Sequence, residues 1–341
     1  MSRRRERGVV LLAVLFFVLL ASAGVATFLS RAVVDGMAAG NRDAAARAEA
    51  LARGGVRLAI AALLQDLLQE KEEQFEADTS QDLWARLGAV PLPLDDGGVL
   101  QIRIEDAGGR LSLNSLFAKG EVRDEKSEIF LGELLTKVIE EIPVRPEQKL
   151  YDVPVLARNL IDWVDVDSVR VAGGEEDDYY QSQAPPYRAA NLPLLSVDEL
   201  LLIEGFDAQL VNALRPYVDV LPIVEADGVN PNTAPSWVLA LVYHGQAGSQ
   251  RLANEDTVRR ILDIREQNGI LCNDEANHPA CTPLREVVEG EVYPPLTFHA
   301  DVFRVTAEAR YGEVRRTVEA VVDRSDRSDA EVPAILAWKV R

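Results

Sequence analysis

An uncharged apolar run close to the N-terminus constrains this chain more than any other feature. Residues 9–29, VVLLAVLFFVLLASAGVATFL, hold 21 residues without a charge, and residues 1–8 before them hold four arginines and one glutamate. About 20 apolar residues, each adding ~1.5 Å of helix, cross the hydrocarbon core of a bilayer. Arginine-rich flanks stay in the cytoplasm. The run therefore predicts a transmembrane helix, with the rest of the chain on the far side of the membrane.

Two general explanations of the run compete. A secretory signal peptide has a shorter apolar region that ends in small residues at a cleavage site. The triplet Ala21-Ser22-Ala23 fits that pattern, but the apolar run continues to Leu29. A signal anchor, which stays in the membrane, fits the composition alone.

A third explanation starts from Gly8, which directly precedes the run. An Arg-Gly pair in this place resembles the leader of type IV prepilins and pseudopilins. The resemblance implies that a prepilin peptidase cuts after Gly8 and methylates the new N-terminal residue, Val9. Most members of that class carry a glutamate at the fifth mature position, which is Ala13 here.

The chain is acidic and long enough for a substantial folded part. It has 341 residues, 48% of them hydrophobic, which suffices for two domains with cores of their own beyond the anchor. The formal net charge is −19, and it becomes −22 when residues 1–8, with four arginines and one glutamate, are removed. Such a surface repels nucleic-acid phosphates and attracts cations and basic partners.

The membrane helix is expected to continue into a second, amphipathic half. Residues 43–68 are rich in alanine, leucine, arginine and glutamate and contain no proline. Apolar residues recur there at helical spacing. They include Leu51, Val56, Ala59, Leu63 and Leu67. A long helix whose second half packs on a globular domain is the expected result.

Two regions far apart in the chain show the alternation of strands. In residues 97–116 apolar and polar side chains alternate, and Gly108 and Gly109 predict a tight turn into a second strand. Residues 301–323 predict another hairpin, with its turn at Gly312. Because largely helical sequence lies between these regions, the simplest architecture is an α+β domain interrupted by an inserted helical domain.

Helical patterns define the inserted domain. Residues 128–142 and 153–164 have helical spacing, and residues 196–218 and 232–269 each predict helical pairs: a helix, a turn and a second helix in the first range, and two successive helices in the second. Such pairs resemble helix-hairpin-helix modules, but the turn IEGFD carries acids where DNA-binding modules carry lysines, so nucleic-acid binding is not expected. The expected division is 1–8 for the leader, 9–29 for the transmembrane segment, 30–120 and 293–341 for the pseudopilin-type helix and antiparallel sheet, and 121–292 for the inserted α-helical domain.

An acidic loop is the candidate metal site. It begins with the segment DWVDVDS and continues through GGEEDDYY. Calcium takes roughly six to eight oxygen ligands, which carboxylates clustered on a flexible loop supply. A solvated acidic turn is the alternative, and the glycine and terminal glutamate of an EF-hand loop fall at the wrong positions. The candidate ligands, if the loop folds back, are Asp162, Asp165, Asp167, Glu175, Glu176, Asp177 and Asp178.

The chain has two cysteines, Cys272 and Cys281. They lie in a loop-like stretch of a part predicted to lie outside the cytoplasm, so a local disulfide is expected. His278 lies between them and raises zinc as an alternative, but the paired Cys-x-x-Cys spacing of zinc sites is missing.

Five motifs, in this order along the chain, resemble those of the K-class minor pseudopilins of type II secretion. They are NLIDW (159–163), GGEEDDYY (173–180), PYRAAN (186–191), SVDEL (196–200) and NPNTAP (230–235). The resemblance implies a pseudopilin fold with a large helical insertion and calcium bound by the acidic region. It is also consistent with Ala13, because this class typically lacks the glutamate at the fifth mature position.

The resemblance also implies a function and partners. It implies a structural subunit at the tip of the periplasmic pseudopilus that initiates assembly and supports protein export across the outer membrane. The implied partners are the I-class and J-class minor pseudopilins, the major pseudopilin and the prepilin peptidase. The implied location is the inner membrane, with a single pass and the globular part in the periplasm.

Catalysis is not expected. The three histidines, at positions 244, 278 and 299, lie in no nucleophile motif, and the chain has no Gly-x-Ser-x-Gly elbow, no P-loop and no His-Glu-x-x-His. A non-catalytic structural subunit is the prediction. A membrane-anchored helix-hairpin-helix binding protein of the envelope is the alternative.

Overall fold

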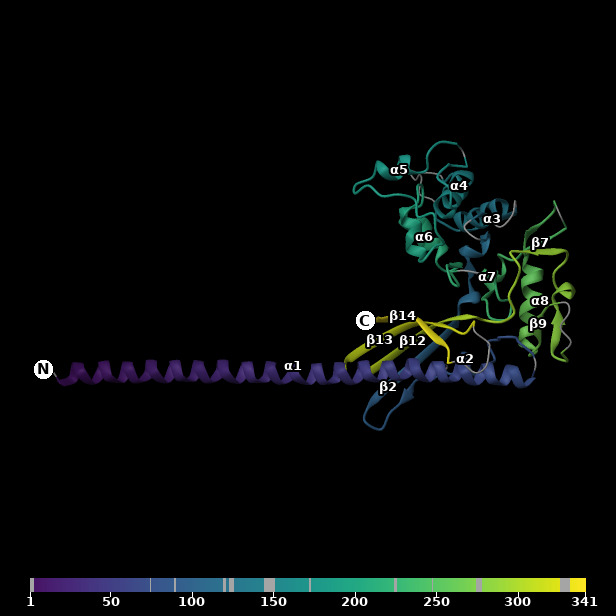
Figure 1. Ribbon diagram of the computed structural model, residues 1–341. Helices are drawn as coiled ribbons and strands as arrows, with labels where there is room; N and C mark the ends of the chain where they lie inside the picture. Colours follow the sequence, from purple (N-terminus) through teal and green to yellow (C-terminus); the bar gives the residue numbers. More distant parts are fainter. Residues whose placement is uncertain are drawn as a thin grey trace.

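One helix dominates the computed structural model (Figure 1), which describes residues 3–341 apart from 74, 89, 119–120, 123–125, 144–150, 172, 224–225, 247, 274–277 and 326–331. Helix α1 (Arg3–Glu73) is 71 residues long, and its side chains are exposed from Val10 to Met37. Among the described helices, it alone is long and apolar enough to cross a membrane by length and composition, with a mean hydropathy of 2.6 in its most apolar window. The predicted membrane segment lies in this exposed half.

The second half of α1 packs on a sheet. Val56, Ala59 and Leu63 are fully buried in this contact, so the predicted amphipathic half is confirmed. Gly55 lies at the closest approach, because a Cβ there would meet Leu100 Cδ1 at 2.9 Å and Ala307 Cβ at 3.0 Å. The missing side chain lets the helix backbone lie directly against the strands.

The sheet has five antiparallel strands in the order β1-β2-β12-β13-β14. Strands β12 and β13 form the predicted C-terminal hairpin, joined at Gly312, whose φ of 56° favours glycine. The strands span Leu92–Pro93 (β1), Gly98–Asp106 (β2), Val302–Tyr311 (β12), Val314–Asp323 (β13) and Ala334–Val340 (β14).

The hairpin predicted at Gly108 and Gly109 is wrong. The chain makes a 3-10 turn there (Ala107–Gly109), and the next strand, β3 (Leu111–Ser112), leaves the sheet to pair in parallel with β6 (Val218–Asp219). A two-residue hairpin turn of the type that favours Gly-Gly needs positive φ at both residues. Neither glycine has one, because the Asp106 side chain accepts a hydrogen bond from the Gly108 N–H and holds the 3-10 turn.

The inserted domain has a hydrophobic core of its own. This core includes Leu111 and Leu113, so it begins before the predicted boundary at 121. The two helices predicted first are confirmed as α3 (Lys126–Glu140) and α4 (Val153–Val164).

The first predicted helix pair is formed by the 3-10 helix Val197–Leu202 and α6 (Ala208–Leu214), with Gly205 between them at φ 90°. The second differs from the prediction, because strands separate α7 (Ser236–Leu239) from α8 (Glu255–Glu266). The remaining elements are α2 (Leu83–Arg86), α5 (Asp177–Gln181), β4 (Phe117–Ala118), β5 (Glu121–Val122), β7 (Tyr243–Gly245), β8 (Arg251–Leu252), β9 (Ile270–Cys272), β10 (Cys281–Pro283) and β11 (Glu291–Tyr293), with 3-10 helices Leu113–Leu116 and Leu284–Glu286.

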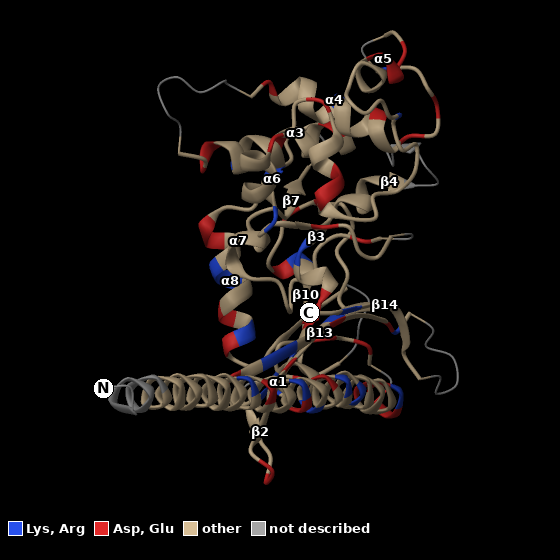
Figure 2. Ribbon diagram, turned by 90° about the vertical axis from the view of Figure 1, so that its left-hand side faces the viewer, with Lys and Arg blue, Asp and Glu red and all other residues tan. Residues whose placement is uncertain are grey.

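The sheet separates α1 from the insert. In Figures 1 and 2 the insert rises from the side of the sheet that faces away from α1, and it lies toward the C-terminal end of that helix. The exposed N-terminal half of α1 projects far beyond the sheet in the opposite direction (Figure 1). The insert and the exposed apolar half of α1 therefore occupy opposite ends of the molecule.

Candidate metal centre

Three carboxylates converge at the far end of the insert. Asp162 lies in the last turn of α4, Asp165 directly follows that helix, and Glu176 precedes α5. Each offers an oxygen, and these oxygens lie within 4.8 Å of one another. Asp162 and Glu176 are buried and Asp165 is half-buried.

A tight loop returns Glu176 to the end of α4. Val169 and Glu175 form an antiparallel bridge, and the Arg170 N–H donates to the Gly174 carbonyl at 3.0 Å. Gly173 and Gly174 have φ values of 87° and 104°, which side chains disfavour. The glycine pair in the middle of the acidic motif is therefore what allows the loop to fold back.

The electrostatics of the site favour a bound cation. Burial raises the pKa of Glu176 to about 7, with the charges of Asp165 and Asp162 adding to the effect, and burial with the charge of Asp167 raises the pKa of Asp165 to about 6. Both carboxylate oxygens of Glu176 and Oδ1 of Asp165 are buried without a well-formed hydrogen bond to a described residue, and the nearby Asn191 side chain only partly offsets the rise in the pKa of Glu176. Buried carboxylates without donors are costly unless a cation meets them. The cluster thus fits a hard divalent cation such as calcium.

The other predicted ligands have different surroundings. Asp167 accepts the Val169 N–H at 2.7 Å and lies at the border of the cluster. Asp177 accepts the Ala189 N–H at 3.1 Å, and its other oxygen lies 3.6 Å from Arg188. The structure does not bring these residues, Glu175 or Asp178 into the group of converging carboxylates.

Asn191 is a further residue of this site that was not predicted as a ligand. Its side-chain amide donates to the Asp167 carbonyl, its side chain lies beside Glu176, and its own φ is 48°. An asparagine at the end of the PYRAAN motif is the one signal for it, because asparagine tolerates left-handed backbone better than most residues. Asn191 thereby ties that motif to the acidic loop.

Aromatic side chains from three of the motifs form the wall behind the loop. Trp163 packs edge-on against Tyr180 and Tyr187, with ring centroids 5.2 and 6.3 Å away. The Tyr187 hydroxyl donates to the Leu202 carbonyl at 2.7 Å. Three of the five motifs that carry the family resemblance therefore meet in one place.

A second acidic group already contains its own cation. Asp66, Asp78 and Asp82 have oxygens within 4.8 Å of one another, near the C-terminal end of α1. The Arg324 guanidinium is buried among them, 2.7 Å from Asp66 Oδ2 and 2.6 Å from Asp78 Oδ1. The guanidinium supplies to Asp66 and Asp78 the positive charge that a metal ion would bring, so this group does not fit a metal site.

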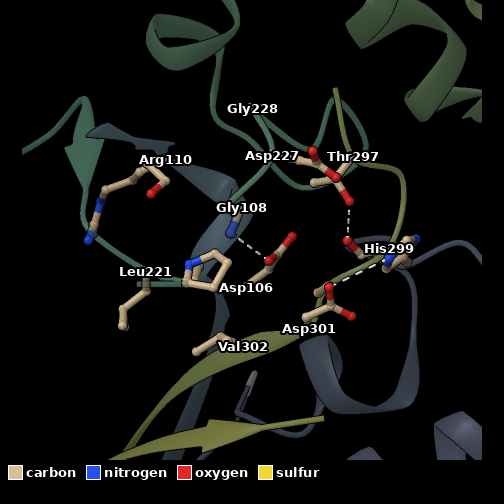
Figure 3. A pocket seen from close by; sticks show the side chains of 14 residues that line it. Asp106, Gly108, Arg110, Leu221, Asp227, Gly228, Thr297, His299, Asp301 and Val302 are labelled. Carbon is tan, nitrogen blue, oxygen red and sulfur yellow. Dashed lines mark hydrogen bonds and ion pairs between the residues drawn. The ribbon is translucent and has the colours of Figure 1, made fainter. Parts of the chain in front are cut away.

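The NPNTAP motif has a structural role where the insert joins the sheet. Figure 3 shows Asp106 at this junction, beside a cavity of roughly 30 Å³, which is large enough to hold water. Its carboxylate accepts hydrogen bonds from Asn230 Nδ2 at 2.9 Å and from Thr233 Oγ1 at 2.6 Å. Asn232 bonds both the N–H and the carbonyl of Leu271. The motif thus links the end of β2 to the core of the insert.

The two cysteines are joined in the structure. Cys272 ends β9 and Cys281 begins β10, with their Cα atoms 5.9 Å apart across a disulfide. The His278 ring stacks on Phe75 with centroids 4.1 Å apart. Zinc would need free thiolates, so the structure gives no support to that alternative.

These features define a class: a long helix, apolar enough in its first half to cross a membrane, packs through its second half on an antiparallel sheet, as in pilin-like subunits, and a large insert carries an acidic loop. The family profile described as "Type II secretion system (T2SS), protein K" matches residues 109–223. Type II secretion system protein K of Pseudomonas aeruginosa is 31% identical over 334 residues, covering 97% of this chain and 93% of that protein. The protein of the same name from Aeromonas hydrophila is 28% identical, with 94% and 93% covered.

The fold has a solved counterpart. A chain in the crystal structure of the GspK-GspI-GspJ complex from the enterotoxigenic Escherichia coli type 2 secretion system aligns with a TM-score of 0.59 at 19% identity. The alignment covers 86% of this chain and 96% of that one. The chain described here belongs to the type II secretion system protein K family.

Proposed function

We propose that this chain is the minor pseudopilin at the tip of the periplasmic pseudopilus, incorporated before the filament elongates. The observation that carries the proposal is the position of the insert. It lies at the opposite end of the molecule from the membrane-spanning half of α1 (Figure 1). A further subunit added above this one would have to occupy the space of the insert, whereas subunits added from the membrane side would not.

Residue 13 supports the same position. In a filament the N-terminal amine of each subunit lies among neighbouring helices, where an unpaired charge is costly unless a carboxylate meets it. The glutamate usual at the fifth mature position supplies that carboxylate, and this chain has Ala13. A subunit at the tip has no neighbour above it whose amine needs pairing.

The proposal includes processing of the leader. Cleavage after Gly8 and methylation of Val9 would leave a mature chain that begins with the apolar half of α1. Mass spectrometry of the N-terminus tests this step directly. A chain that begins with N-methylated Val9 is expected, and an intact leader would instead indicate a signal anchor.

The acidic loop is proposed to hold calcium through Asp162, Asp165 and Glu176, which the structure brings together. A bound cation would offset the repulsion of three buried or half-buried carboxylates and fix the loop against the end of α4. The ion would thereby stabilise the conformation of the loop, and no chemical step is assigned to it.

The proposed partners are the I-class and J-class minor pseudopilins, supported by the solved complex in which the structural counterpart is found. The major pseudopilin and the prepilin peptidase complete the set, with α1 in the inner membrane and the remainder in the periplasm. The proposed role is structural and not catalytic. The envelope protein with helix-hairpin-helix modules has less support, because strands interrupt the second helix pair.

Imaging of labelled subunits tests the tip position. Pseudopili assembled with a fluorescent or gold label on this chain should carry one label at one end. Ala13→Glu should allow some incorporation into the shaft, and Arg251→Ala, on an exposed strand of the insert, serves as a matched control. Wild-type label along the shaft would overturn the proposal.

A further inference from the structure

Strand β14 is an open edge of the sheet. All seven of its residues are exposed, and within the described part of the chain no strand pairs with its outer side. Four of them are large and apolar: Ile335, Leu336, Trp338 and Val340 are 45%, 55%, 38% and 38% exposed. A long apolar edge strand is a ready template for pairing with another chain.

The backbone groups available for pairing can be identified from the ladder. Arg341 and Thr317 exchange two hydrogen bonds, at 2.9 and 3.0 Å. In an antiparallel ladder such pairs alternate with pairs whose N–H and C=O groups point outward. Val340 and Trp338 occupy the outward positions in the register, so their backbone groups face the open edge.

Three of these four apolar side chains lie on the same side of the sheet as α1. Ile335, Trp338 and Val340, here called the β14 shelf, stand opposite β13 residues that are buried under α1. The guanidinium of Arg53, on α1, lies over the Trp338 ring, 5.7 Å from its centroid. An added strand would thus place alternate side chains on an apolar surface that flanks the helix.

The opposite edge of the sheet is protected. Strand β1 is two residues long, and one of them, Pro93, has no N–H to donate. Stacking of identical sheets edge to edge would need this edge to receive β14. Beyond the two residues that β1 covers, Gly88 lies directly against the Ile102 carbonyl of β2, so the edge is not open there. Of the two edges, β14 is therefore the one open to pairing with another strand.

A symmetric pair of two β14 strands is excluded by the membrane. Antiparallel pairing relates the two copies by a twofold axis perpendicular to the sheet. Helix α1 runs along the sheet (Figure 1), so this axis would point the two α1 helices in opposite directions. Both could not then enter the same bilayer, so a strand that pairs antiparallel with β14 comes from a different chain.

Charge beside the edge indicates the chemistry of that chain. Arg53 and Arg57 lie on the adjoining turns of α1, whereas Lys339 and Arg341 project from the other face of β14, on the side of Glu319. Ion pairs with Glu49 (2.6 Å) and Glu319 (3.2 Å) neutralise Arg53 and Arg341. One further basic side chain remains on each face, Arg57 and Lys339, so a partner strand with flanking carboxylates is complementary to this edge.

We propose that β14 accepts an extended strand from a second, similarly anchored pseudopilin-type subunit, with apolar residues at alternate positions and acidic residues beside them. The added strand lies against the β14 shelf and bonds the outward backbone groups of Trp338 and Val340. This inference rests on the proposed function, because the partner comes from the same apparatus.

Photo-crosslinking in cells tests the inference with the full chain. A photoreactive amino acid is placed at Leu336 or Val340, with co-expressed I-class and J-class subunits as the probe. The control position is Gln101, which is exposed on β2 on the opposite face. Probes on β14 should give a crosslinked product with one of these subunits, and the crosslinked peptide should come from one of that subunit's strands. The probe at Gln101 should give no such product.

A backbone variant makes the test specific for strand pairing. Val340→Pro removes the outward N–H of residue 340 and leaves the hydrogen bonds to β13 in place. Because the partner strand loses one hydrogen bond, the crosslinking yield at Leu336 should fall about tenfold. Val340→Ala, which keeps the N–H, should retain most of the product. Equal yields from the two variants would overturn the inference, as would a product of two copies of this chain or no product above the control.

Co-purification distinguishes a failure of the β14 inference from a failure of the proposed function. If the I-class and J-class subunits still co-purify with this chain while β14 gives no crosslink, the β14 inference fails and the proposed function stands. If neither subunit co-purifies, the proposed function fails as well.

Discussion

Replacing the buried arginine Arg324 with methionine should destabilise the fold strongly. The guanidinium bonds Asp66 and Asp78 at 2.7 and 2.6 Å, and it lies over the Phe303 ring at 4.8 Å. Its side chain is fully buried. Arg324→Met keeps most of the volume and the contact with the ring, but it leaves the carboxylates without their cation.

The magnitude follows from the burial of the network. Removing one partner of a buried ion pair costs about 3–5 kcal/mol. For a chain of this size each kcal/mol corresponds to about 2–4 °C of melting temperature, so a fall of about 6–20 °C is expected.

The loss should depend on pH. Burial and the charge of Asp78 raise the pKa of Asp66 to about 7 even though Arg324 lowers it, so removal of the arginine raises it further. The folded state then binds a proton that unfolded aspartate has released, and stability falls as pH rises from about 4 to above 7. The deficit of the variant should therefore be larger at pH 8 than at pH 5.5.

Thermal melting of the full chain in detergent micelles with saturating calcium measures both effects. The matched control is Arg315→Met on β13, because that side chain is 66% exposed and lies 3.5 Å from Glu308. Exposed pairs contribute less than about 1 kcal/mol. Equal shifts for the two variants, or a larger Arg324 deficit at pH 5.5, would refute the reasoning.

Three further predictions concern separate parts of the fold. Calcium should raise the melting temperature of the wild-type chain by mass action. Glu176→Gln should abolish that rise, and Asp178→Asn, at an exposed position, should preserve it. A wild-type melting temperature that is the same with and without chelator would disprove the calcium site. Thiol labelling without reductant should leave Cys272 and Cys281 unmodified, and their replacement by serine should cost roughly 2–3 kcal/mol for a loop this short; two reactive thiols would disprove the bridge. Gly55→Leu should destabilise by about 1–3 kcal/mol, because the new side chain overpacks the contact between α1 and the sheet; a melting temperature like that of wild type would show that α1 can shift away.

Periodicity made the long elements predictable. The amphipathic half of α1 and the β12–β13 hairpin follow from apolar spacing, because each buries one face on a single neighbour. The hairpin expected at Gly108 failed for a non-local reason. Asp106 turns the chain into a 3-10 helix and also bonds Asn230 and Thr233, more than 120 residues away. Sequence spacing alone carries no signal for such a contact.

The convergence of carboxylates was predictable as a region and not residue by residue, and the calcium site itself stays a prediction. Asp162 and Asp165 follow from their place at the end of one helix, whereas Glu176 joins them only through the bridge between Val169 and Glu175. The burial and pairing of Arg324 could not be predicted from the sequence, because its partner Asp66 lies 258 positions away. A single arginine among 36 basic residues does not stand out by composition.

The uninterrupted helix α1 makes the molecule a mechanical rod. At ~1.5 Å per residue, its 71 residues extend about 107 Å, with the sheet fixed to one end and the bilayer around the other. A force that draws the membrane half outward by one helical turn, ~5.4 Å, moves the sheet by the same distance. The insert, held to the sheet through Asp106 and Asn230, moves with it. Work done on the helix within the bilayer is thus delivered as displacement at the far end of the insert.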